Sequence, residues 1–145
     1  MTRMHLQRFA VIVMLLASVA CGGGNGDDDD NNPVGPIGTG QGSDPQITNN
    51  TDDFQWQLSN ASGFSTNGGY TWRNTGTRAR VSNSSNFSSG TGTLTIRDSG
   101  GRVVFSGNLS TNGNFTTDSG PTGEWRIELA PSGVSGTLSF RVQKD

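Results

Sequence analysis

The sequence has little of what enzymes use for catalysis. It contains one histidine, His5, and one cysteine, Cys21, in 145 residues. Residues 1–20 are interpreted below as a targeting segment, and without them no histidine is left for a Ser-His-Asp or Cys-His arrangement. The same scarcity argues against zinc and other transition-metal sites. We therefore expect a protein that is not an enzyme, with no catalytic residue, no metal and no cofactor.

Paired carboxylates are the remaining route to acid–base catalysis. Glu124 and Glu128 fall on one face of a predicted strand, but four strand residues separate them by about 13 Å. Glycosidases place their two carboxyl groups about 5–9.5 Å apart. A pairing across strands with Asp98 or Asp118 stays open, although both lie in Gly/Ser-rich turns, where aspartate commonly bonds the backbone.

The chain is also poor in charge and in helix-forming runs. Charged residues make up 15% of it, and 22 glycines accompany abundant Ser, Thr and Asn. This composition favours short strands and turns over helices. Residues 22–53 hold seven aspartates and no basic residue, whereas residues 54–145 hold eight basic residues against five acidic ones, a net charge of +3. So small a charge argues against nucleic acid as a partner.

Long apolar runs are lacking except near the N-terminus. Arg3 and Arg8 precede the apolar residues 9–20, FAVIVMLLASVA, in the pattern of a secretory signal peptide. As a helix this run spans about 18 Å, less than the ~30 Å hydrocarbon core of a bilayer. We therefore expect residues 1–20 to be a signal peptide and not a membrane-spanning helix.

The segment SVAC, which ends at Cys21, resembles the lipobox of bacterial lipoproteins. Val19 and Ala20 fit the family pattern, and Ser18 stands where the family usually has an aliphatic residue. The resemblance implies that Cys21 is acylated and becomes the N-terminus, which explains why no second cysteine is present to form a disulfide. By the same resemblance, Gly22 in place of aspartate after the cysteine implies release to the outer membrane of a bacterial cell envelope. The first expected partner is thus the membrane, bound through acyl chains.

Residues 21–53 are rich in Gly, Asp, Asn and Pro and have scarcely an apolar side chain. Such a segment cannot bury enough surface to offset its conformational entropy. We predict a disordered tether with a root-mean-square reach of roughly 30 Å. The aspartates at 27–30 lack the alternating ligands and bidentate acid of a calcium loop, so we interpret them as solvated charges.

Residues 54–145 show the period of two that is typical of half-buried strands. Apolar and polar residues alternate over residues 54–58, 70–72, 94–96, 125–129 and 138–142. Turn-forming clusters such as NASG, DSGG and APSG separate these segments. We predict an all-β domain that forms a single antiparallel, jelly-roll-like β-sandwich of seven or eight strands.

The aromatic residues follow the same alternation. Trp56, Trp72 and Trp125 each share a phase with apolar neighbours. This favours a place in the core over an exposed platform for sugar binding.

Three segments resemble strands of the pre-peptidase C-terminal and proprotein P-type β-sandwich domains of secreted bacterial proteins. They are DSGGRVV (98–104), GEWRIEL (123–129) and GTLSFRV (136–142). The resemblance implies a sandwich without catalysis of its own, which acts beside another protein.

The outward phase of the predicted strands carries arginines. Arg78 and Arg80 are two residues apart, so their side chains should point the same way and present two guanidinium groups to one ligand. An anionic glycan or an envelope protein is therefore a possible partner, with solubilising surface charge as the simpler interpretation. The sequence predicts a lipid-anchored, non-catalytic binding or structural module; the alternative is an accessory subunit of a separately encoded exported enzyme or transport complex.

Overall fold

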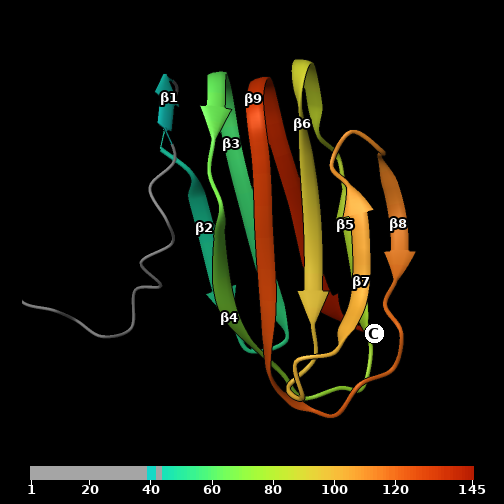
Figure 1. Cartoon of the computed structure of the whole chain (residues 1–145). Coiled ribbons are helices and arrows are strands. Elements are labelled where there is room, and N and C mark those ends of the chain that lie inside the picture. The colour runs from blue at the N-terminus through green and yellow to red at the C-terminus, as the bar shows by residue number, and fades with distance from the viewer. Residues whose placement is uncertain (1–38, 42–43) are drawn as a thin grey trace, which may run out of the picture.

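The structure is a computed structural model that describes residues 39–41 and 44–145. The predicted signal peptide, Cys21 and the predicted tether up to residue 38 lie outside the described residues. The described part contains nine strands, all paired antiparallel (Figure 1). The strands are β1 (Thr39–Gln41), β2 (Gln46–Asn50), β3 (Asp53–Ser65), β4 (Gly68–Asn74), β5 (Ala79–Asn83), β6 (Asn86–Arg97), β7 (Val103–Asn108), β8 (Gly113–Thr116) and β9 (Gly123–Lys144). The predicted all-β class is confirmed.

Strand β9 takes part in both layers of the fold. Up to Leu129 it pairs with β4 on one side and β6 on the other, and β7 lies beyond β6. From Leu138 onward it pairs with β3 and β5, and β2 and β8 form the outer strands. The two layers face each other across one core, so the predicted antiparallel β-sandwich is confirmed.

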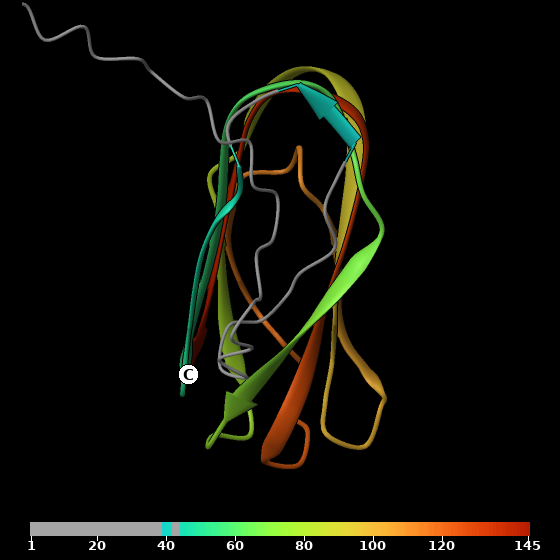
Figure 2. The same ribbon diagram turned by 90° about the vertical axis from the view of Figure 1, so that its left-hand side faces the viewer.

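Three strands curve from one layer into the other at one end of the molecule. Figure 2 shows β3, β6 and β9 passing over this end as an arch. The clusters NASG and APSG, which we expected to separate strands, instead lie within β3 and β9. They bend the strands because Asn60, Gly63 and Gly133 adopt left-handed backbone conformations, with φ of 56°, 65° and 62°, while pairing continues on both sides.

The folded domain begins before the predicted boundary between residues 53 and 54. Strand β2, which falls in the predicted tether, pairs with β3 along its whole length. Its one apolar side chain, Ile47, is half-buried against the core, and the Asn49 side chain donates a hydrogen bond to the Thr71 carbonyl at 2.9 Å. The predicted boundary is therefore too late. A single apolar residue gave no alternation by which β2 could be predicted.

The core between the layers is rich in aromatic side chains. Trp56, Trp72 and Trp125 are each at most 1% exposed, which confirms their predicted burial. Trp56 Nε1 donates to the hydroxyl of Tyr70 in the opposite layer at 3.0 Å. Burial raises the pKa of Tyr70, with the Trp56 hydrogen bond acting in the opposite direction. The indole groups thus bury apolar area and still satisfy their polar atoms.

Candidate functional site

Arg78 and Arg80, the predicted anionic-ligand residues, are both exposed at the start of β5. Arg80 forms an ion pair with Asp145 at 2.9 Å, and Arg78 donates through Nε to the Ser119 hydroxyl at 2.9 Å. The two guanidinium groups therefore have different neighbours, and one charge is already paired. Binding of an anion by this pair stays a prediction.

Arg78 instead meets Arg102 at Ser119. Arg102 donates to the Ser119 carbonyl and forms an ion pair with Asp98 at 3.4 Å. Asp98 is buried, and its Oδ1 accepts hydrogen bonds from the amides of Gly100 and Arg102 at 2.9 and 3.0 Å. Its carboxylate thus closes the turn between β6 and β7, as expected of aspartate in a DSGG sequence.

Glu128 lies between two arginines on the outer face of the layer formed by β4, β6, β7 and β9. Arg97 Nε is 3.2 Å from both carboxylate oxygens, and Arg126 Nε is 3.2 Å from Oε1. Both carboxylate oxygens of Glu128 are thus engaged by guanidinium groups of the protein itself. The group Arg97–Glu128–Arg126 is best understood as a surface ion-pair network.

Asp52 connects three segments at the turn between β2 and β3. Its carboxylate accepts hydrogen bonds from the Thr75 amide and hydroxyl, each at 2.7 Å, and from Lys144 Nζ at 2.9 Å. The Thr75 amide is the largest cause that lowers the pKa of Asp52 to about 2, and partial burial opposes it. Beside it, two hydrogen bonds from Arg141 lower the pKa of Asp53.

This network predicts a loss of stability in acid. The pKa of Asp52 in the folded state, about 2, lies below its ordinary value of 3.8. Its stabilisation is therefore complete above about pH 4 and is lost as the pH falls towards about 2. With allowance for solvent screening, this contribution is about 1–2 kcal/mol. Urea unfolding across this pH range should show the loss in the native protein and a flatter dependence in Asp52→Asn.

Lys144→Met distinguishes the contribution of Lys144 to the lowered pKa of Asp52 from that of Thr75. The Thr75 amide, the largest cause, is kept in this variant, so most of the pH dependence should persist. The assignment to Asp52 is wrong if native protein and Asp52→Asn lose stability equally between about pH 4 and pH 2.

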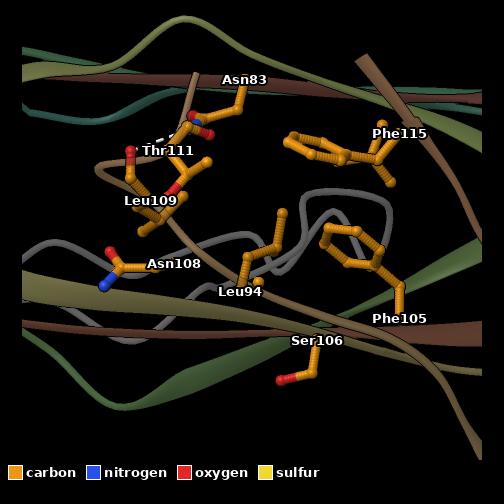
Figure 3. A pocket seen from close by; sticks show the side chains of 10 residues that line it. Asn83, Leu94, Phe105, Ser106, Asn108, Leu109, Thr111 and Phe115 are labelled. Carbon is orange, nitrogen blue, oxygen red and sulfur yellow. Dashed lines mark hydrogen bonds between the residues drawn. The ribbon is translucent and has the colours of Figure 1, made fainter. Parts of the chain in front are cut away.

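A partly open pocket of about 260 Å³ lies between the layers, where β5 and β8 face β6 and β7. The side chains of Val81, Leu94 and Leu109 supply aliphatic surface, and none of the lining residues is charged. Phe105 and Phe115 lie next to each other on one side of the pocket, with ring centroids 5.8 Å apart and planes tilted by 44° (Figure 3). Concave sites with this much apolar surface are typical places for ligand binding.

Asn83 forms part of the pocket wall, where its side chain lies beside Thr111 (Figure 3). Its Nδ2 donates to the carbonyls of Leu109 and Thr111 at 2.8 and 2.9 Å, and its Oδ1 accepts from the Ser85 hydroxyl at 2.8 Å. These bonds hold the connection between β7 and β8 against β5. Among the described residues, every buried side-chain nitrogen or oxygen has a hydrogen-bond partner.

The pocket was not predicted, although the sequence contains a signal for it. Phe105 and Phe115 each have a glycine two residues away in or at the start of the same short strand, Gly107 and Gly113. A Cβ on Gly107 would lie 2.8 Å from Phe105 Cζ, and one on Gly113 would lie 3.4 Å from Phe115 Cζ. Glycine within a strand marks a place that another group approaches closely, and here that group is a phenyl ring.

These features define the described part of the chain as an all-β sandwich with an apolar, uncharged pocket at one side. Comparison of the sequence with protein families and with curated proteins finds no match. The resemblance of three segments to secreted β-sandwich domains therefore stays a prediction. In residues 39–41 and 44–145, no cluster of three or more His, Cys, Asp or Glu side chains could hold a metal ion. The same residues contain no helix with the length and apolar character to cross a bilayer.

Proposed function

We propose that this protein is lipid-anchored in a bacterial cell envelope and that its β-sandwich is a non-catalytic binding module. The observation that carries the proposal is the position of Cys21, the one cysteine, directly after an apolar run and before a polar, acidic segment. A thiol used for acylation needs this position, because the apolar run directs export and the following segment separates the lipid from the folded domain.

The described domain supports a binding role more than a catalytic one. None of the residues that line the pocket is charged, and neither of its hydroxyl side chains, Ser106 and Thr111, has a histidine, lysine or carboxylate beside it in the lining that could activate it. The acidic groups Asp98 and Glu128 are engaged by turn amides and arginines. Concave, mostly apolar sites of this kind hold ligands through shape and burial.

The proposed anchor predicts both the N-terminal residue of the mature protein and its modification. Protein extracted from the host envelope should begin at Cys21 and carry acyl chains, as measured by mass spectrometry of the N-terminal peptide. Several buried acyl chains, at about 0.8 kcal/mol per methylene, should keep the protein in the membrane fraction.

Cys21→Ser should abolish acylation and leave the signal peptide attached, whereas Ser18→Ala, which keeps a small residue near the processing site, should be processed normally. An unmodified Cys21 thiol on a processed chain would refute the anchor. Co-purification of an exported enzyme with the intact protein would favour the accessory-subunit alternative over an independent binding module.

A further inference from the structure

We propose that the pocket between β5, β6, β7 and β8 binds a neutral ligand through an aromatic group of one or two rings. The inference rests on the proposed binding function and deepens it, because it assigns that function a site and a class of ligand. No step of it depends on where the protein is anchored.

The size of the pocket sets the size of the ligand. Protein interiors are normally packed as densely as organic crystals, with few voids larger than a water molecule. An apolar cavity of about 150 Å³ is known to hold benzene. The pocket of about 260 Å³ is larger and partly open to solvent. It therefore has room for a single ring with a substituent or for two fused rings.

The lining of the pocket determines the polarity of the ligand. None of the lining residues is charged, so a charged group in the pocket would lose its hydration without gaining an ionic partner. Asn83 is the buried polar residue of the wall, and both its amide donors and its carbonyl are already hydrogen-bonded within the protein. The pocket thus favours the burial of a neutral, apolar group.

The two phenyl rings favour an aromatic group over an alkyl chain. Phe105 and Phe115 are half-buried, so part of each ring stays available for a further contact. Their planes are tilted by 44°, so a ligand ring could contact the face of one phenyl ring and the edge of the other. Aromatic partners prefer tilted and offset arrangements and gain about 0.5–1.5 kcal/mol per pair beyond area burial.

Gly107 leaves space beside the Phe105 ring. Gly107 pairs with Leu94, so it lies on the face of β7 that is directed to the core. The tip of the Phe105 ring occupies the space where a Gly107 side chain would be. When a ligand binds, the Phe105 ring can therefore shift along β7, because residue 107 has no side chain to obstruct it.

The test uses the full-length protein with ¹³C-labelled methyl groups, free of lipid, so that neither probe partitions into a bilayer. Indole and 1-octanol are neutral probes with equal numbers of non-hydrogen atoms, one aromatic and one linear. Indole should shift the methyl signals of Leu94 and Leu109 and leave those of Leu58, a core residue of β3 outside the pocket, unchanged. Indole should also bind more tightly than 1-octanol.

Phe115→Ala removes one aromatic wall and should weaken indole binding about tenfold. Phe87→Ala is its matched control, because Phe87 is also half-buried but does not line the pocket. If Phe115→Ala does not fold, Thr111→Trp provides the second variant. Thr111 is exposed at the pocket, so a tryptophan there should cover the opening and block binding with little effect on the core.

Three results would each overturn the inference: shifts of equal size at Leu58, tighter binding of 1-octanol, or unchanged indole binding in the variant that folds. None of them affects whether Cys21 is acylated. Failure of the ligand assignment is thereby distinguished from failure of the proposed anchor.

Discussion

Gly90→Ala is expected to lower the free energy of unfolding by about 3–5 kcal/mol. Gly90 lies in the bend of β6 with a φ of 89°. A Cβ there would be 2.5 Å from the carbonyl carbon and oxygen of Gly133 and 2.6 Å from Val134 Cα. These are backbone atoms of β9, so no side-chain rotation relieves the clash and the arch must deform.

Gly63→Ala is the control for Gly90→Ala. Gly63 also has a positive φ, 65°, but a Cβ there would have no other atom within 4 Å. Its cost should be limited to the backbone conformation, about 1–2 kcal/mol. Urea denaturation of both variants measures the difference. Equal losses of stability would show that the backbone contact between β6 and β9 at the arch is not tight.

Trp72→Ala should lower the free energy of unfolding by about 3–5 kcal/mol, as expected when a buried tryptophan is truncated. Trp72 is fully buried and packs edge-to-face on Trp125, with ring centroids 6.1 Å apart. Its Nε1 also donates to the Asn50 carbonyl at 3.1 Å, which fastens the end of β2. The variant therefore loses core packing and a contact to an outer strand together.

Val103→Ala is the matched control for Trp72→Ala. Val103 is 40% exposed, so its truncation should change stability by less than about 0.5 kcal/mol. Urea unfolding followed by circular dichroism compares the two. A small effect for Trp72→Ala would mean that the stability of the fold does not depend on this buried side chain.

The inner faces of the strands were predictable because burial on one face imposes a period of two. Phe54, Trp56 and Leu58 are all buried, as are Leu138, Phe140 and Val142 in the paired part of β9. The path of the chain at APSG was not predictable. Proline, serine and glycine are compatible both with a turn and with a bend, and the outcome depends on whether neighbouring strands continue to pair on both sides.

The pocket depends on contacts that local sequence does not encode. Asn83 bonds the carbonyls of Leu109 and Thr111, which are more than twenty residues away. The predicted joint site of Arg78 and Arg80, by contrast, was based on local spacing alone. Local spacing correctly predicted that both are exposed, but it contained no information about Asp145, which pairs with Arg80.

The double role of β9 has a consequence for how the protein acquires its structure. This strand pairs with β3, β4, β5 and β6, so neither layer has its central strand until residues 123–144 are present. The pairings are distant in sequence, as between Phe54 and Val142, and folding that depends on such contacts is slow and cooperative. A chain that is synthesised from its N-terminus therefore cannot complete either layer until β9, its last strand, has been made. This order of assembly suits the export that we propose, because a polypeptide crosses a membrane in extended form only before it has folded.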